Sequence, residues 1–255
     1  MRMMSLQSGS NGNCVYVEAD GVRLLIDAGI SGVQMQERLA TQGIDPRSIT
    51  ALLITHDHSD HVRGMGVFHR KFGMPVYVTP PTLMSARRRI KLGQIDHVHC
   101  FQSGDCLRIG DVTIETVPTP HDGVDGVGFV IDDGQQRLGI LTDLGHKFAG
   151  LTDVLQSLDG VLLESNYDPR MLADGPYPEF LKARIAGPGG HISNLEAAEL
   201  LEAAMRGRLS WACLGHLSEQ NNEPELALAT HRAVLGPHVA LRIASRYAAT
   251  GIWDV

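Results

Sequence analysis

Short apolar runs separated by glycine- and aspartate-rich turns fill the first half of the chain, and this pattern predicts strands. Longer stretches carry apolar residues three and four positions apart, which predicts helices; the first lies between Ser31 and the helix-ending Gly43. The predicted strands are 3–7, 14–18, 22–26, 51–55, 75–78, 96–101, 106–109, 112–117, 126–131, 137–141, 160–163, 210–214 and 239–243. The predicted helices are 31–42, 62–72, 179–185, 194–205 and 223–235.

A β-rich first half and an alternating second half suit two sheets packed face to face with helices outside, which is a four-layer αββα sandwich of the α/β (α+β) class. No repeat, low-complexity tract or linker interrupts the chain, so we expect a single domain over residues 1–255. No segment approaches the roughly 20 apolar residues of a membrane span. The first 13 residues lack the apolar core of a secretory signal. We therefore expect a cytoplasmic protein without membrane contacts, and the four scattered cysteines agree with this expectation.

The segment with the most chemical information is residues 56–61, His-Asp-His-Ser-Asp-His, which follows the predicted strand 51–55. Side chains two positions apart in extended backbone face the same way, so His56 and His58 lie on one side. The following turn carries Asp60 and His61 towards a second metal. Imidazole and carboxylate groups at this density are typical ligands of transition metals. The alternative is a polar loop whose histidines cap the next helix, and the density of potential ligands disfavours it.

Three further potential ligands each follow a predicted strand: His121, Asp143 and His216. Each one alone is weak evidence, because a polar residue at a strand end is more often a surface or capping residue. Their joint placement with the loop at His56 indicates one metal site at a sheet edge.

The formal net charge of −7 does not indicate a nucleic-acid binder, although two divalent ions would cancel about four negative charges. One local basic run stands out, Arg87, Arg88, Arg89 and Lys91. A solvated helix face and a contact with nucleic acid are both consistent with it.

The order Asp27, Thr55-His-Asp-His-Ser-Asp-His61, His121, Asp143 and His216 resembles the metallo-β-lactamase superfamily over nearly the whole chain. The resemblance implies the αββα sandwich with a dinuclear site at one edge. It implies that His56, His58 and His121 bind one metal, that Asp60, His61 and His216 bind the other, and that Asp143 bridges them. Asp27 would orient the ligand loop by hydrogen bonds, or would only cap a turn.

Three later segments resemble the nuclease branch of this superfamily: Glu164-Ser-Asn-Tyr-Asp168, Gly190-His-Ile-Ser-Asn194 and Gly215-His-Leu-Ser218. In that branch a histidine that is not a metal ligand pairs with an upstream glutamate, which implies a pair between His191 and Glu164. Together with Ser8-Gly-Ser-Asn-Gly-Asn13, these segments resemble the compact YycJ (WalJ) family. The resemblance implies a 5′-to-3′ exonuclease acting on double-stranded DNA and linked to mismatch repair.

The ligand pattern predicts a dinuclear metal-dependent phosphodiesterase that uses two divalent ions, Zn²⁺, Mn²⁺ or Fe²⁺, and the resemblance implies that it is a 5′-to-3′ DNA exonuclease. Its candidate catalytic residues are Asp60, His191 and Glu164. A metal pair supplies the attacking hydroxide and neutralises the phosphate, and His191 would protonate the leaving oxygen while Glu164 holds its tautomer. The alternative is that His191 only caps the helix at Asn194 and that Glu164 pairs with a lysine.

Two other functions remain open on the sequence alone. One is a small-substrate metallohydrolase, such as a cyclic phosphodiesterase or a thioesterase of the glyoxalase II kind, and the other is a non-catalytic metal-binding scaffold. The segment 8–13 suits a hairpin turn better than a phosphate-binding turn. Weak candidates for contacts with the DNA backbone are Tyr167, Lys182, Arg184 and Arg246.

Overall fold

The computed structural model describes all residues from 1 to 255. The N-terminal strands form a mixed sheet. By their contacts the residues divide into two units. Unit 1 comprises residues 1–118, 123–135 and 245–254, and unit 2 comprises residues 119–122, 136–244 and 255.

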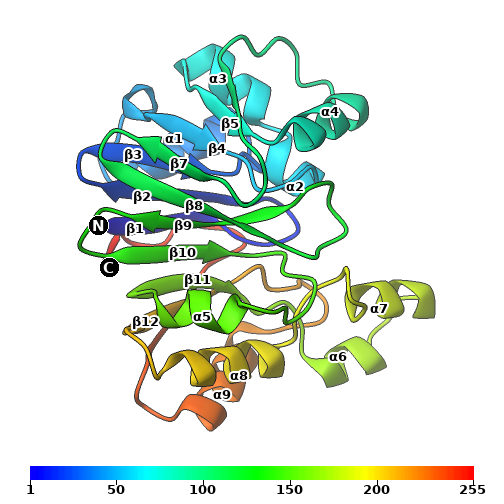
Figure 1. Cartoon of the computed structure of the whole chain (residues 1–255). Helices are drawn as coiled ribbons and strands as arrows, with labels where there is room; N and C mark the ends of the chain where they lie inside the picture. The colour runs from blue at the N-terminus through cyan, green and yellow to red at the C-terminus, as the bar shows by residue number, and fades with distance from the viewer. The chain divides into compact units, whose positions relative to one another are not determined.

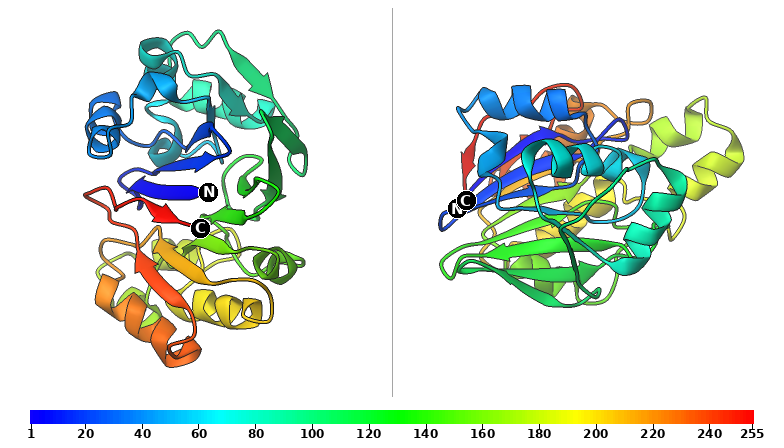
Figure 2. Two further views of the ribbon diagram at one scale, coloured as in Figure 1. Left: turned by 90° about the vertical axis from the view of Figure 1, so that its left-hand side faces the viewer. Right: turned by 90° about the horizontal axis from the view of Figure 1, so that it is seen from above.

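The main sheet of unit 1 has seven strands, and β14 pairs with β1 at its edge (Figure 2, red beside blue). Their order is β14 (Trp253–Asp254), β1 (Arg2–Gln7), β2 (Cys14–Ala19), β3 (Val22–Ile26), β4 (Ala51–Leu53), β5 (Val76–Val78) and β6 (Val98–Cys100). Pairing is antiparallel from β14 to β3 and parallel from β3 to β6. Because β3 and β4 are parallel, the segments after Ile26 and Leu53 leave the sheet at the same edge.

Three helices of unit 1 bury their apolar faces against one face of this sheet (Figure 1). They are α1 (Gly32–Ala40), α3 (Met65–Phe72) and α4 (Pro80–Arg89), and they contribute Met35, Phe68 and Leu83 to the apolar core. Full burial of a side chain of this size stabilises the fold by about 1.5–3 kcal/mol. The 3₁₀ turn Pro46–Ser48 precedes β4, and an antiparallel meander of β7 (Cys106–Ile109), β8 (Val112–Pro118) and β9 (Val127–Asp132) completes unit 1.

Unit 2 contains four parallel strands in chain order, β10 (Arg137–Leu141), β11 (Gly160–Glu164), β12 (Trp211–Gly215) and β13 (Ala240–Ile243). Helices α5 (Leu151–Gln156), α8 (Asn194–Ala204) and α9 (Pro224–Leu235) lie along them, and α6 (Pro169–Asp174) and α7 (Glu179–Ile185) extend from the unit (Figure 1). Parallel strands end at a common edge, so Asp143, Glu164 and His216 emerge there together.

The prediction of one helix over residues 62–72 is wrong, because the structure has α2 (Ser59–Val62) and α3 with a break at Gly64. The backbone N–H of Gly64 donates to the carbonyl of Ala28, and the carbonyl of Asp60 accepts from the N–H of Asn13. A Cβ atom at Gly64 would lie 2.4 Å from the carbonyl oxygen of Ile30, so this close approach requires glycine. Around Gly64, hydrogen bonds to distant segments therefore replace the hydrogen bonds that a continuous helix would form.

The element prediction also omitted α4, α5, α6 and the two-residue β14.

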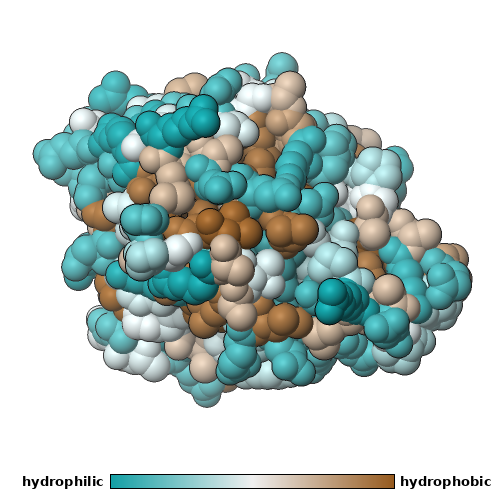
Figure 3. All heavy atoms as spheres, turned by 90° about the horizontal axis from the view of Figure 1, so that it is seen from below, coloured by the Kyte–Doolittle hydropathy of each residue, from teal (hydrophilic) through white to brown (hydrophobic).

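None of the helices combines the length and the apolar character that crossing a bilayer requires. Figure 3 shows one face on which hydrophilic side chains surround smaller apolar areas. In unit 2 the large apolar side chains with the greatest exposure are Phe180 and Leu195.

Candidate metal centre

In unit 1, the carboxylate of Asp27 fixes the orientation of His61. Asp27 is buried directly after β3, and its Oδ2 accepts a 2.7 Å hydrogen bond from Nδ1 of His61. The backbone N–H and the hydroxyl of Thr55 also donate to this carboxylate, at 2.9 and 3.0 Å. Because a carboxylate only accepts, Nδ1 carries the proton and Nε2 presents its lone pair. This geometry favours the orienting role expected for Asp27.

The other imidazoles of the loop gather around His61. The ring centroids of His56 and His61 lie 4.1 Å apart, and those of His56 and His58 lie 4.6 Å apart. Nδ1 of His56 lies 3.0 Å from the hydroxyl of Thr55. His56 and His61 are buried, and Oδ2 of Asp60 lies 3.5 Å from Nε2 of His61. Unit 1 thus brings all four predicted ligands of this loop together.

Asn13 braces this cluster, although the sequence analysis gave it no role in the site. Its Nδ2 lies 2.9 Å from Nε2 of His61 and 3.2 Å from Oδ2 of Asp60. The turn before it holds itself together, since Gly9 N–H donates to Oδ1 of Asn13 and Gly12 N–H donates to the Gly9 carbonyl. Segment 8–13 is therefore a hairpin turn, and the side-chain amide of its last residue, Asn13, contacts the predicted ligands Asp60 and His61.

Asp57, between the predicted ligands His56 and His58, faces away from them and towards helix α4. Its Oδ2 accepts from the Ser85 hydroxyl at 2.5 Å and lies 3.3 Å from Nη1 of Arg89, and its Oδ1 accepts from Val124 N–H at 2.9 Å. Burial raises the pKa of Asp57, but these two hydrogen bonds and the attraction of Arg89 and His58 outweigh burial and lower it overall. An ionised Asp57 therefore fastens the loop to α4.

In unit 2, Asp143 and His216 lie at the ends of parallel strands in left-handed backbone, with φ of 57° and 54°. Their side chains meet, because Nδ1 of His216 lies 3.4 Å from Oδ1 of Asp143. The side-chain amide of Asn166 donates to the carbonyl of His216 at 2.7 Å. Asn166 is a supporting residue that the sequence analysis did not identify.

Glu164 and His191 form a close pair beside these two residues. Oε1 of Glu164 lies 2.6 Å from Nδ1 of His191, and Oε2 accepts from the N–H groups of Leu144 and Ile192 at 3.0 and 3.2 Å. Burial raises the pKa of Glu164, but the charges and hydrogen bonds of His191 and His216 lower it overall, well below its ordinary value. Ser193, rather than His191, caps helix α8, so the capping alternative is wrong.

His121 lies in the same unit and is buried. Its Nδ1 donates to the Gly190 carbonyl at 2.8 Å, and its Nε2 lies 3.7 Å from Oδ1 of Asp143. The rings of His121 and His191 have centroids 4.9 Å apart. Unit 2 thus brings together its three predicted ligands and the predicted pair Glu164 and His191.

The donor set fits divalent metal ions. Ligand atoms of Asp143, Glu164, His191 and His216 lie within 4.8 Å of one another. Nδ1 of His61 and Nδ1 of His121 donate to protein acceptors, which leaves Nε2 of these two rings for a metal. Imidazole and carboxylate together suit zinc, manganese or iron.

The weak candidates for DNA contacts are already engaged in the fold. Tyr167 is buried. Arg184 binds Asp122 at 2.7 Å, and Lys182 donates to the Ala173 carbonyl at 2.6 Å. Arg246 packs against Gly9, whose added Cβ would lie 2.8 Å from the guanidinium. These contacts favour structural roles for the four residues.

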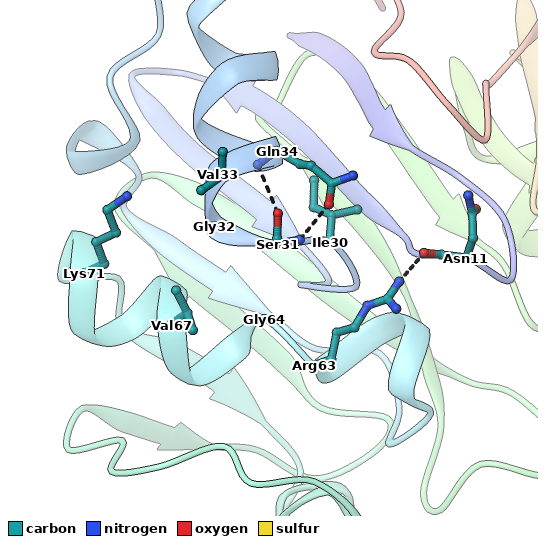
Figure 4. A pocket seen from close by; sticks show the side chains of 10 residues that line it. All are labelled: Asn11, Ile30, Ser31, Gly32, Val33, Gln34, Arg63, Gly64, Val67 and Lys71. Atoms are coloured by element: carbon teal, nitrogen blue, oxygen red, sulfur yellow. Dashed lines mark hydrogen bonds between the residues drawn. The ribbon is translucent and has the colours of Figure 1, made fainter.

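A pocket of about 730 Å³ opens beside helices α1 and α3 in unit 1, and no predicted site residue lines it (Figure 4). Its cations have partners, because Arg63 donates to the carbonyls of Asn11 and Gly29, and Lys71 donates to Gln36 at 3.1 Å. Arg63 connects the turn before β2 to the segment after β3, which is a structural role. Because the cations of the pocket are paired and no predicted site residue lines it, we assign the pocket no role in the chemistry.

Comparison with known proteins identifies the class. Residues 8–216 match the model of the metallo-beta-lactamase superfamily. The metallo-beta-lactamase fold protein YhfI from Bacillus subtilis has a similar structure, with a TM-score of 0.74 at 16% identity over 99% of both chains. The αββα fold predicted from the sequence is thereby confirmed.

Two relatives define the family more narrowly. The chain is 37% identical to exodeoxyribonuclease WalJ of Streptococcus pneumoniae serotype 2 (strain D39 / NCTC 7466), over 88% of this chain and 84% of that protein. It is 33% identical to exodeoxyribonuclease YycJ of Bacillus anthracis, over 90% of this chain and 87% of that protein. The chain belongs to the WalJ/YycJ family of the metallo-β-lactamase superfamily, as the motifs predicted.

Proposed function

We propose that this protein is a dinuclear metal-dependent phosphodiesterase that removes nucleotides from the 5′ ends of double-stranded DNA. The names of the two family members support the substrate class. The geometric observation that carries the proposal is the pair Glu164 and His191, 2.6 Å apart beside Asp143 and His216. A histidine held by a buried carboxylate next to metal ligands suits proton transfer to a departing oxygen.

The proposed ligand sets divide between the two units, which we propose fold as one domain over residues 1–255. His56, His58 and His121 would hold one ion, Asp60, His61 and His216 the other, and Asp143 would bridge them. When bound, two divalent ions activate water for attack and neutralise phosphate charge. Zinc and manganese suit these ligands best, and iron is compatible with them.

The residues of the chain supply the rest of the chemistry. Asp27 and the Gly190 carbonyl hold the Nδ1 protons of His61 and His121, so both imidazoles keep Nε2 unprotonated. Glu164 remains a carboxylate and holds the Nδ1 proton of His191. With 19% of its side chain exposed, His191 is accessible to a substrate and can deliver a proton from Nε2 to the leaving 3′-oxygen.

The test is a nuclease assay paired with metal analysis on the same preparation. Protein loaded with Mn²⁺ is incubated with duplex DNA labelled at either the 5′ or the 3′ end, and in parallel with bis(p-nitrophenyl) phosphate and with a glutathione thioester. We expect mononucleotides released first from the 5′ end and two bound metal ions per chain.

Three outcomes would contradict the proposal. Cleavage of only the chromogenic phosphodiester or the thioester would indicate a small-substrate hydrolase. Release of mononucleotides from the 3′ end would reverse the polarity. Full metal content without any hydrolysis would leave a metal-binding scaffold. An Asp143→Asn preparation is the matched control for contaminating nucleases.

A further inference from the structure

Helix α4 ends in Arg87, Arg88 and Arg89, and Lys91 follows two positions later, in a chain whose formal net charge is −7. All four side chains are exposed. The side chain of Arg89 lies 3.3 Å from Asp57, whereas the side chains of Arg87, Arg88 and Lys91 form no hydrogen bond or ion pair with another residue. The proposed function does not explain three uncompensated cations within five positions.

These cations are fixed next to the metal-ligand loop within unit 1. Ser85 and Arg89, one helical turn apart on α4, both reach Asp57, which lies between His56 and His58. Asp57 is fully buried, and Val124 N–H completes its contacts. These contacts connect the end of α4 to the loop that carries the four predicted ligands of unit 1.

A shallow pocket of about 360 Å³ lies on the same helix, lined by Pro81, Met84, Ser85, Arg88 and Val124. The four lining residues that belong to α4 are spaced three and four positions apart, so they lie on one face of the helix. Met84 is 56% exposed and Val124 is 38% exposed. Exposed apolar side chains beside an unpaired cation match a nucleic-acid strand, whose sugars and bases offer apolar contacts and whose phosphates attract the cation.

We propose that the C-terminal end of α4 binds the phosphate backbone of the DNA substrate and positions it at the metal centre. Arg87, Arg88 and Lys91 contact phosphates, and Met84 and Val124 contact the strand within the pocket. This inference rests on the proposed function and assigns a substrate-binding surface to it. Neutralised phosphates release counterions, so these contacts weaken as salt increases.

The test compares two triple variants with equal charge. Arg87→Gln/Arg88→Gln/Lys91→Gln removes the three unpaired cations, and Arg47→Gln/Arg108→Gln/Arg206→Gln removes three exposed cations elsewhere, so both change the net charge from −7 to −10. The dissociation constant for a phosphorothioate duplex that resists cleavage is measured from 50 to 200 mM NaCl. Thermal midpoints and metal contents equal to those of the wild type establish that the variants are folded.

We expect the α4 variant to bind at least roughly tenfold more weakly at low salt, with a salt slope smaller by about 0.9 for each lost contact. The control variant should bind like the wild type. A second variant, Met84→Glu, places a negative charge in the pocket and should weaken binding in the same direction.

Equal affinity and equal salt slope in all variants would make α4 a solvated helix face and overturn this inference. In that case wild-type cleavage of DNA would leave the proposed function intact. Absence of DNA cleavage by the wild type would instead refute the proposed function itself, so the two failures are distinguishable.

Discussion

Asp27 is the residue whose substitution tests whether a buried carboxylate orients a predicted metal ligand, because it accepts a hydrogen bond from His61. Asp27→Asn keeps the shape of the side chain, and asparagine tolerates the φ of 64° at this position. The substitution removes one of the carboxylate acceptors shared by His61 and Thr55. We expect metal affinity about 10–100-fold lower, measured by competition with a chelating dye. Asp20→Asn is the matched control, because Asp20 is exposed and also has positive φ; equal affinities in both variants would refute the orienting role.

Substitution of His191 distinguishes a role in proton transfer from a role in metal binding. His191→Ala should lower kcat on DNA by about 10²–10⁴-fold, because the leaving oxygen loses its proton donor. Metal content should remain that of the wild type. The exposed His99 offers a control substitution, His99→Ala, which should change neither quantity. Loss of a metal ion from the His191 variant would show that His191 is a ligand, a role that its place in the cluster with Asp143 and His216 allows.

At the scale of elements, strand ends were the most predictable part of the site. Apolar runs ending at Leu141 and Leu214 predicted that Asp143 and His216 would lie together at a sheet edge. The structure adds that these strands are parallel, so both residues leave the sheet at the same edge. Asp143 and His216, like Asp27, have left-handed backbone, which costs about 1–3 kcal/mol at such positions and depends on surrounding contacts. A periodicity pattern carries no information about that backbone geometry.

The supporting residues were less predictable for the same reason. Asn13 and Asn166 read as a turn residue and a loop residue, and their roles arise from contacts with residues 48 and 50 positions away. The break between α2 and α3 likewise depends on hydrogen bonds to Ala28 and Asn13. The family motifs led to the Glu164–His191 pair, whereas local pattern alone allowed a helix cap.

Helix α9 carries a buried histidine with a predictable effect on stability. His231 donates from Nδ1 to the Ala227 carbonyl at 2.8 Å, and its Nε2 is buried without a partner. Burial lowers the pKa of His231 from 6.5 to about 4. The unfolded chain therefore binds a proton that the folded chain excludes between these pH values, and stability decreases as pH falls from 6.5 towards 4. We expect about 2–3 kcal/mol of this loss by pH 4.5.

Urea unfolding of metal-free protein at pH 7 and pH 4.5 measures this contribution. His231→Leu should lose less stability than the wild type between the two pH values, because leucine binds no proton. His238→Gln, at an exposed position, should retain the wild-type difference. A His231→Leu protein with the same difference as the wild type would show that His231 is already protonated, or not buried, in the fold.

At the scale of the whole molecule, the predicted ligands are divided between the two units. Unit 1 contributes His56, His58, Asp60 and His61, and unit 2 contributes His121, Asp143 and His216. Under the proposed function, neither unit alone supplies all the proposed ligands of either metal ion. Metal binding would therefore stabilise the complete fold rather than one unit. A metal ion that binds only the folded chain at 100 times its dissociation constant adds about 2.7 kcal/mol for each site.

Removal of metal by a chelator should therefore lower the thermal midpoint of the entire chain in a single transition, and Zn²⁺ or Mn²⁺ should restore it. Asp143→Asn removes the proposed bridging carboxylate and should lose most of this stabilisation, whereas His238→Gln removes an exposed imidazole outside the site and should keep it. Calorimetry with and without metal makes the comparison. If Asp143→Asn were stabilised as strongly as the wild type, the added ions would be binding elsewhere and the shared centre would be refuted. If metal shifted only one of two separate transitions, the ligands of a single unit would suffice.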